Sequence, residues 1–378
     1  MASAYRADHV GSLLRPPELL QARADLADGR ITEDQLHASE DAAIVKALEV
    51  QQQAGISIFT DGEYRRTGWS GALREVAEGL VRDSEPAARR LLGTWQGPHA
   101  DLANSGTTTL SGVAVAERMR LKRRMTGLDA AFLRQHAPGP WKITMPGPYS
   151  VGGQLYKPGV TDQVYGSRDA FIDELVGILQ HEADALTQAG AAYLQLDSLH
   201  YVERVADHTI RERMMQDGEN PDQYLDAIIA ADNRVLDHMH APGVTVGLHM
   251  CRGNNRSAWH AEGSYEPIAD KAFNQLNVDR FLLEYDTERA GGFEPLRFMP
   301  RNKMVVLGLI SSKEPALESI DALKRRVDEA ARYVPIENLA ISPQCGFAST
   351  MLGNLLTWDE MRRKLELVAE AARTIWGD

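Results

Sequence analysis

The chain has 378 residues, of which 43% are hydrophobic and 25% charged, a composition typical of a folded globular protein that buries a sizeable core. Its formal net charge of −12 argues against nucleic acid and anionic membranes as partners, and no apolar stretch approaches the roughly 18 residues of a membrane-spanning helix. Without the apolar core of a secretion signal and with only two cysteines, we expect a cytoplasmic protein with reduced thiols.

Eight short apolar or β-branched segments predict β-strands along the chain. They lie at 8–13, 56–60, 141–145, 192–197, 244–249, 281–285, 304–310 and 339–342. Several are almost wholly apolar, as expected of parallel strands that are covered on both faces. A largely parallel sheet therefore follows from the strand pattern.

Segments with helical periodicity separate these strands. Apolar residues at helical spacing follow Ser167, a predicted N-cap, and the pattern ends at Gly190. The segments 316–333 and 358–376 also have the period of a helix. Two pairs have the spacing of a capping box and predict helix starts: Thr32 with Gln35, and Thr357 with Glu360.

Eight strands that alternate with helices predict an α/β fold, the (β/α)8 TIM barrel. A doubly wound open sheet gives the same alternation and is the alternative. The segment 63–140 is too long for one helix and its loops, and we interpret it as an insertion after the second strand. We therefore predict a single domain over 1–378 with an insertion at 63–140.

Polar and ionisable residues follow the predicted strands. In a (β/α)8 barrel the catalytic groups gather at the C-terminal ends of the strands. In chain order these ends read Gly11-Ser12, Asp61-Gly62-Glu63, Pro146-Gly147-Pro148, Asp197-Ser198-Leu199-His200, His249-Met250-Cys251, Glu284-Tyr285-Asp286, Ser311-Ser312-Lys313 and Gln344-Cys345. We expect the active site among them.

Four of these residues are candidate metal ligands. His249 and Cys251 are two residues apart, which places both side chains on one face of a strand or in the loop just beyond it. Glu284 and Cys345 follow at intervals that match one and two βα units. Because imidazole, thiolate and carboxylate are the ligands that zinc takes in proteins, the pattern predicts a zinc site. The alternative is that the cysteines are small buried hydrophobic residues.

The predicted ligand set indicates the kind of reaction. Two thiolates and a carboxylate around Zn²⁺ leave a formal charge of about −1, which makes the metal a poor Lewis acid for hydrolysis. Such a site suits a substrate thiol, whose pKa the metal lowers so that the sulfur is held as a nucleophilic thiolate. We therefore expect alkyl transfer to sulfur.

At these residues the sequence resembles the C-terminal catalytic half of cobalamin-independent methionine synthase, and most closely its short, single-barrel members. The resemblance covers most of the chain, from residues 8–12 to Gly346-Phe347, and rests on His249-x-Cys251, Glu284 and Pro343-Gln344-Cys345-Gly346. It implies a zinc-dependent methyltransferase that converts homocysteine to methionine. In that family the four positions matching His249, Cys251, Glu284 and Cys345 hold the zinc ion.

The resemblance also implies substrate contacts. Gly11 and Ser12 match a segment that holds the carboxylate of the amino acid, and Glu63 matches the acid that receives its ammonium group. Asp197 matches an acid that contacts the amino acid near the pterin, and Glu203 matches an acid that reads the pterin ring. From the residues alone, Glu63 could equally form a structural ion pair, and Asp197 could equally cap a helix.

The chain departs from the family at two strand ends. The fourth strand end reads Asp197-Ser198-Leu199-His200, where the long synthases have Asp-Glu-Pro. The seventh strand end, Leu309-Ile310-Ser311-Ser312-Lys313, lacks the histidine that is thought to assist proton transfer in those synthases. We take Asp197 and His200 as the candidate catalytic residues, although His200 could equally form hydrogen bonds behind the site. Lys313 is either an anion contact or a solvated surface residue.

Several functions remain open at this point. The donor is methyltetrahydrofolate or a methyl-corrinoid, the latter carried by a separate corrinoid or other methyl-carrier protein. An alternative is another thiol alkyltransferase, such as one that joins coenzyme M to an epoxide, in which Arg252 would bind the sulfonate unless it pairs with Glu284. Glu63 and Asp197 would be unnecessary there, which favours homocysteine. A third reading is a non-catalytic metal- or corrinoid-binding barrel.

Overall fold

The computed structural model describes residues 5–83, 94–105 and 112–377. The strands are β1 (Ala77–Arg82), β2 (Val113–Leu121), β3 (Lys142–Pro146), β4 (Tyr193–Ser198), β5 (Thr245–Met250), β6 (Arg280–Glu284), β7 (Met304–Ile310) and β8 (Leu339–Pro343). The α-helices are α1 (Pro17–Ala27), α2 (Glu33–Gln53), α3 (Gly71–Val76), α5 (Ala100–Asn104), α6 (Gly127–His136), α7 (Pro148–Leu155), α8 (Thr161–Tyr165), α9 (Arg168–Ala189), α10 (His208–Gln216), α11 (Pro221–Met239), α12 (Glu266–Gln275), α13 (Ile320–Ala330) and α14 (Trp358–Trp376). Short turns add the π-helical η1 (Tyr201–Ala206) and the 3-10 turns η2 (Glu288–Ala290), η3 (Glu294–Phe298) and η4 (Ile336–Asn338).

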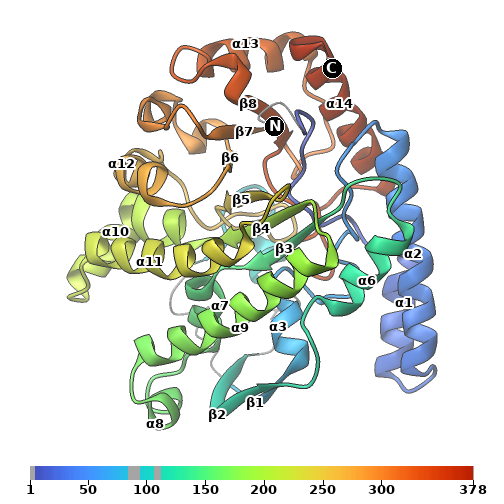
Figure 1. Cartoon of the computed structure of the whole chain (residues 1–378), viewed down its shortest axis with the longest axis vertical. Coiled ribbons are helices and arrows are strands. Elements are labelled where there is room, and N and C mark those ends of the chain that lie inside the picture. Colours follow the sequence, from blue (N-terminus) through green and yellow to red (C-terminus); the bar gives the residue numbers. More distant parts are fainter. Residues whose placement is uncertain (1–4, 84–93, 106–111, 378) are drawn as a thin grey trace.

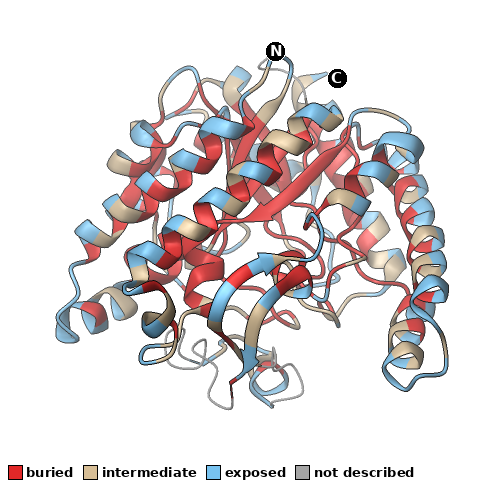
Figure 2. Cartoon of the chain, turned by 60° about the horizontal axis from the view of Figure 1, so that its bottom comes forward, coloured by how far each residue is buried: buried red, intermediate tan, exposed pale blue. Residues whose placement is uncertain are grey.

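The central sheet runs in the order β3-β4-β5-β6-β7-β8, with every neighbouring pair parallel. Helices lie around it on the outside, as in α9, α11, α12, α13 and α14 (Figure 1). The strands of this sheet are buried almost throughout, whereas the helices are buried on the side toward the strands and exposed on the other (Figure 2). This arrangement explains why the strands are nearly continuous apolar runs.

The first two predicted strands are present as single bridges rather than regular strands. Ala7 pairs in parallel with Ile341 of β8, and Phe59 pairs in parallel with Trp141 just before β3. The two segments are joined by hydrogen bonds from Thr60 Oγ1 to the Gly11 carbonyl (2.9 Å) and from the Leu13 amide to the Gly62 carbonyl (3.1 Å). They therefore connect β8 to β3 and complete the predicted (β/α)8 barrel.

Side chains and glycines explain why the segments 8–13 and 56–60 do not extend into strands. The Gln51 side chain of α2 accepts from the Thr60 amide and donates to the Thr60 carbonyl, both at 2.9 Å, so it takes the place of a neighbouring strand. Gly11 has φ +143° and Gly62 has φ +68°, which turns the backbone out of the extended conformation. The prediction of two regular strands here was wrong.

The predicted helix ends are formed. The capping boxes at Thr32 and Thr357 each have both hydrogen bonds. Ser167 caps α9 by accepting from the Ala170 amide, and Gly190 ends it in the left-handed conformation. The helix predicted at 316–333 is shorter, because α13 begins only after Ser319, whose side chain accepts from the Ala322 amide.

A buried ion network fills the barrel interior below the site. Asp8 accepts from Lys142 Nζ at 2.8 Å and from Arg280 at 3.2 Å. Lys142 also donates to the side chain of Gln195 at 3.1 Å, and Gln195 donates to the carboxylate of Asp197 at 2.7 Å. The interior network therefore orients Asp197 at the end of β4.

The predicted insertion at 63–140 contains α3, α5, α6 and the antiparallel pair β1–β2. Gln96 forms a bridge with Trp259, and the ring of Trp95 stacks on His260 with the ring centroids 3.4 Å apart. This part of the chain therefore packs against the loop that follows β5. Among the described helices, none has both the length and the apolar character needed to cross a membrane.

Candidate active site

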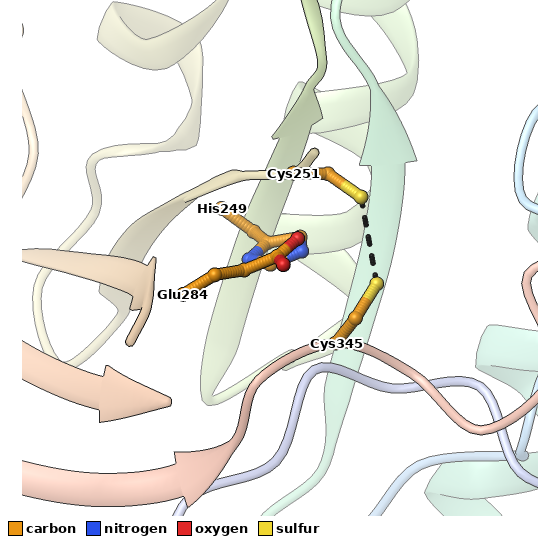
Figure 3. Close-up of side chains that lie close together, drawn as sticks. All are labelled: His249, Cys251, Glu284 and Cys345. Atoms are coloured by element: carbon orange, nitrogen blue, oxygen red, sulfur yellow. Dashed lines mark hydrogen bonds between the residues drawn. The ribbon is translucent and has the colours of Figure 1, made fainter. Parts of the chain in front are cut away.

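The four predicted metal ligands meet at the C-terminal ends of three strands. His249 lies in β5 with Cys251 just beyond it, Glu284 is the last residue of β6, and Cys345 follows β8. Their ligand atoms all lie within 4.8 Å of one another, and all four side chains are buried. Figure 3 shows the four side chains pointing toward one another. The two sulfur atoms are 3.5 Å apart. Residues that lie up to 96 positions apart in the sequence thus form one compact cluster.

The hydrogen bonds of His249 prepare its other ring nitrogen for a metal. Nδ1 lies 3.1 Å from the Leu282 carbonyl, which can only accept, so Nδ1 carries the proton. In the neutral imidazole Nε2 is then the nitrogen with the lone pair, and within the described parts of the chain it is buried without a hydrogen-bond partner. Burial would lower the pKa of His249, but Cys345 and the nearby acids Asp197 and Glu284 raise it to about 9, so a metal ion at Nε2 would displace a proton. A buried lone pair beside two thiols fits a metal ligand whose orientation is fixed by a backbone carbonyl.

Glu284 is held as a carboxylate. Its Oε1 accepts from the Arg252 amide at 2.8 Å, and its Oε2 accepts from the Arg289 guanidinium at 3.0 Å. Burial would raise the pKa of Glu284, but the charges of Arg289, Lys313 and Arg252 together hold the pKa below its usual value. Because a carboxylate oxygen has two lone pairs, each oxygen can still bind a cation.

Only one thiol of the pair, Cys345, is prepared for deprotonation, because the hydrogen bond to Cys345 and burial raise the pKa of Cys251 well above that of a free thiol. A hydrogen bond from Cys251 and the adjacent His249 imidazole lower the pKa of Cys345 well below that of a free thiol, although burial opposes them. The Gly253 amide points at the Cys251 sulfur from 3.3 Å. One imidazole, two thiols and one carboxylate therefore form a donor set that fits a metal ion.

The predicted amino-acid contacts lie on the N-terminal segments. The Ser12 hydroxyl accepts from the Ala348 amide at 3.3 Å, so its segment is tied to the loop after β8. Glu63 has φ +60° and is buried; its Oε1 accepts from Thr144 at 2.8 Å and lies 3.7 Å from Arg66. Its Oε2 has no partner among the residues that the structure describes. Burial raises the pKa of Glu63 despite the opposing charge of Arg66.

Asp197 and Glu203 are buried acids near the cluster. Asp197 is the register partner of His249 across β4 and β5, and burial raises its pKa to about 7. Glu203 lies on η1, and both of its carboxyl oxygens are buried without a partner in the described chain. Burial and the nearby Glu284 raise the pKa of Glu203 to about 8, so this side chain is a neutral acid at pH 7.

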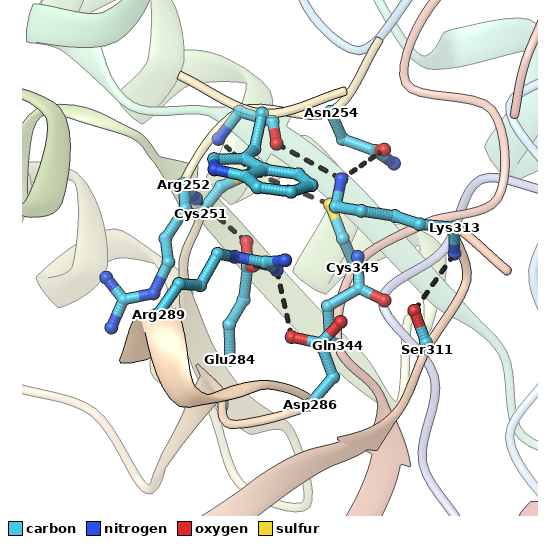
Figure 4. Close-up of polar contacts among 12 residues, drawn as sticks. Cys251, Arg252, Asn254, Glu284, Asp286, Arg289, Ser311, Lys313, Gln344 and Cys345 are labelled. Atoms are coloured by element: carbon cyan, nitrogen blue, oxygen red, sulfur yellow. Dashed lines mark hydrogen bonds and ion pairs between the residues drawn. The ribbon is translucent and has the colours of Figure 1, made fainter. Parts of the chain in front are cut away.

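His200 and Arg252 make contacts away from the cluster. His200 Nδ1 lies 2.8 Å from the Tyr224 hydroxyl, and burial together with Arg204 and Arg168 lowers its pKa well below the usual value, so the ring is neutral. The Arg252 guanidinium lies over the ring of Tyr265 at 4.4 Å and points away from the sulfur atoms (Figure 4). Only the backbone amide of Arg252 reaches a ligand of the cluster.

Two further residues support the cluster: Arg289, which was not predicted from the sequence, and Lys313, whose role the sequence left open. Arg289 bonds both Glu284 (3.0 Å) and Asp286 (2.9 Å), while its guanidinium stacks 4.9 Å from the ring of Trp259. Lys313 is buried rather than solvated. Lys313 lies at a predicted strand end, whereas Arg289 stands in no motif and only the fold brings it to the cluster.

A (β/α)8 barrel whose strand ends bring thiol, imidazole and carboxylate donors together is an enzyme scaffold with a candidate metal centre. The catalytic domain of cobalamin-independent synthase matches residues 7–374, so the chain belongs to this family and is a methyltransferase. The resemblance inferred from the sequence is thereby confirmed.

Individual relatives agree with this membership over nearly their whole length. The chain is 35% identical over 377 residues to the uncharacterized protein YxjH of Bacillus subtilis, covering 98% of this chain and 95% of that protein. It is 24% identical over 375 residues to the methionine synthase of Pyrococcus horikoshii, covering 97% and 94%. The solved structure of a putative vitamin-B12 independent methionine synthase from Listeria monocytogenes matches with a TM-score of 0.74, 28% identity and full coverage of both chains.

Proposed function

We propose that this methyltransferase binds homocysteine through zinc and methylates its sulfur to give methionine. The observation that carries the proposal is the buried cluster of His249, Cys251, Glu284 and Cys345, whose ligand atoms lie within 4.8 Å of one another. The similarity to the methionine synthase of Pyrococcus horikoshii supports an amino-acid thiol as the acceptor.

Zinc suits this donor set better than the harder divalent cations. Thiolate and imidazole ligands favour zinc, whereas magnesium and calcium prefer all-oxygen sites. When bound, zinc would supply the positive charge that keeps a substrate thiol ionised at neutral pH. We assign His249 Nε2, both cysteine sulfurs and the Glu284 carboxylate to that ion.

The charged ends of homocysteine match groups on the neighbouring strand ends. The unpartnered Oε2 of Glu63 and the carboxyl of Asp197 can receive its ammonium group. We assign its carboxylate to the segment at Gly11 and Ser12. Gly11 there has φ +143°, a backbone conformation that glycine adopts readily and other residues rarely do. A side chain at Gly11 would place its Cβ 2.7 Å from Thr144, so this position requires glycine.

For the methyl donor we retain methyltetrahydrofolate and a methyl-corrinoid presented by a carrier protein. Glu203 is a neutral acid with no competing partner in the described chain, which suits it to donate a hydrogen bond to the donor. His200 is a weaker candidate for proton transfer, because its ring is neutral and bonded to Tyr224. We therefore assign His200 to holding the start of η1, and Asp197 with Glu203 to the substrates.

Coenzyme M remains the second candidate thiol. It has no amino group, so it would leave the buried Oε2 of Glu63 without a partner. Its sulfonate would need a cation that faces the sulfur atoms, and the Arg252 guanidinium points away from them (Figure 4). These contacts favour homocysteine.

X-ray absorption at the zinc edge tests the proposal directly. The purified protein should hold about one zinc per chain, and added homocysteine should add a sulfur neighbour at about 2.3 Å. Coenzyme M serves as the comparison thiol, and Cys251→Ser as the control that should lose the metal. A sulfur neighbour that appears with coenzyme M but not with homocysteine would overturn the proposed substrate.

A further inference from the structure

The two cysteines of the cluster lie on separate loops that no covalent bond joins. Cys251 begins the loop after β5, and Cys345 is the second residue of the loop after β8. Their sulfur atoms are nevertheless 3.5 Å apart and buried. Some other contact must therefore fix the position of one loop relative to the other.

Lys313, just beyond the end of β7, holds the first of these loops. Its ammonium group donates to the Asn254 side-chain oxygen at 2.7 Å and to the carbonyls of Gly253 and Ala258, both at 3.3 Å (Figure 4). All three acceptors belong to the loop that Cys251 begins. Because an ammonium group has three N–H donors, Lys313 has none left for an anionic substrate.

Asn254 carries the connection to the second loop. Its side-chain nitrogen donates to the Gly346 carbonyl at 2.7 Å and to the Ser349 hydroxyl at 3.2 Å. Gly346 is the residue after Cys345, and its carbonyl also accepts from Ser312 at 3.1 Å. Because Lys313 can only donate, the Asn254 oxygen must face it and the nitrogen must face Gly346, so the amide has a single orientation.

We propose that Lys313 and Asn254 are positioning residues that form a clamp between the two cysteine loops and set the separation of the sulfur atoms for the metal. The inference rests on the proposed function, since it takes the cluster as the metal site. The clamp contacts neither substrate nor metal. It acts through Gly253 and Gly346, each within two residues of a cysteine.

Lys313→Met removes the clamp while keeping the apolar stem of the side chain. Three buried oxygens lose the ammonium donor, although the Ala258 carbonyl still accepts from the Asn255 amide, and the Asn254 amide loses its fixed orientation. Changes to groups that orient metal ligands typically cost about 10- to 100-fold in metal affinity. We expect a loss of that size for Lys313→Met, and a smaller one for Asn254→Asp, which keeps an oxygen for Lys313 but no donor for Gly346.

Lys303→Met is the matched control. Lys303 is also buried and donates to the carbonyls of Phe273 and Leu276, but it precedes β7 whereas Lys313 follows it. The seven residues of β7 separate the two lysines by roughly 20 Å. Both variants lose a buried ammonium group, so both are expected to lower the melting temperature, and only Lys313→Met should lower zinc affinity.

Two measurements on the full chain separate the clamp from the proposed function. Competition with a chromophoric chelator gives the zinc affinity of each variant. In the metal-free protein, diamide oxidises the two thiols to a disulfide and itself takes up the two electrons and two protons, so the rate of disulfide formation reports the separation of the sulfur atoms. Lys313→Met should slow this rate, because the disulfide forms only when one sulfur reaches the other, and Lys303→Met should leave it unchanged.

Each outcome is decisive. If the wild type binds no zinc but its disulfide forms faster than that of Lys313→Met, the proposed function fails and the clamp stands. If the wild type binds zinc and Lys313→Met matches it in both affinity and rate, the clamp is refuted. Equal losses in Lys303→Met would also refute it. Should Lys313→Met fail to fold, as judged by circular dichroism, Asn254→Asp provides the same comparison.

Discussion

Glu63 offers the sharpest test of how the site recognises its substrate. Its Oε1 accepts from Thr144, and its buried Oε2 has no partner among the described residues. Glu63→Gln keeps the size of the side chain and an oxygen for Thr144 but removes the charge. Hydrogen bonds to charged groups contribute about 1.5–3 kcal/mol, which corresponds to a roughly 10- to 150-fold weaker affinity for homocysteine.

Isothermal titration with two thiols measures this effect. Homocysteine carries the ammonium group, whereas 4-mercaptobutanoate has the same thiol and carboxylate without it. Glu63→Gln should lower the affinity for homocysteine roughly 10- to 150-fold and leave the affinity for 4-mercaptobutanoate nearly unchanged. Glu182 is another buried glutamate; it lies on α9 and bonds Arg124 and Thr126. The control variant Glu182→Gln should change the affinity for neither thiol. The reasoning is refuted if Glu63→Gln binds homocysteine as well as the wild type, or if both thiols weaken equally.

Three further changes probe the site and the barrel. Gly346→Ala would place a Cβ 2.0 Å from the hydroxyl oxygen of Ser12, a proposed substrate contact. Such overpacking costs about 1–3 kcal/mol, so the affinity for homocysteine, measured by isothermal titration, should fall at least several-fold. Lys142→Met leaves Asp8 with one fewer buried partner and should lower the free energy of unfolding by about 3–5 kcal/mol in urea; a loss below about 1 kcal/mol would contradict this. Burial and Lys142 lower the pKa of His9 from 6.5 to about 4. As the pH falls, His9 therefore takes up a proton in the unfolded chain before it does so in the folded protein. The free energy of unfolding should thus fall by about 3 kcal/mol between pH 6.5 and pH 4. His9→Gln should remove that part of the pH dependence, and an unchanged slope would show that His9 does not cause it.

The sequence predicted the cluster because strand ends and ligand types are both local signals. A buried parallel strand is an apolar run, and the residue after it is at the edge where all such strands end. His249, Glu284 and Cys345 therefore stood out before their positions in space were known. The order of the strands then follows from the rule that successive βα units neighbour one another.

Other features depend on side-chain direction, which residue spacing does not encode. Arg252 is adjacent in the chain to Cys251, a candidate metal ligand, yet its guanidinium stacks on Tyr265 and faces away from the sulfur atoms. From the sequence, Lys313 could equally be an anion contact or a solvated surface residue, yet three oxygens of a distant loop surround it. The segment at 56–60 has the composition of a strand, but the side chain of Gln51 occupies its backbone groups.

The charges around the cluster would allow it to accept an anionic sulfur, as the proposed function requires. Two cysteine thiolates, the Glu284 carboxylate and a substrate thiolate would place four negative charges in a buried site, and a divalent metal offsets only half of them. Arg289 bonds Glu284 directly, and the charge of Lys313 also acts on it. Both cations already donate to protein oxygens, since Arg289 bonds Glu284 and Asp286 and Lys313 bonds its three loop acceptors. They therefore add positive charge to the site but have no free N–H donor for the substrate. The substrate sulfur is then expected to bind at the metal position, and no further cation has to face it.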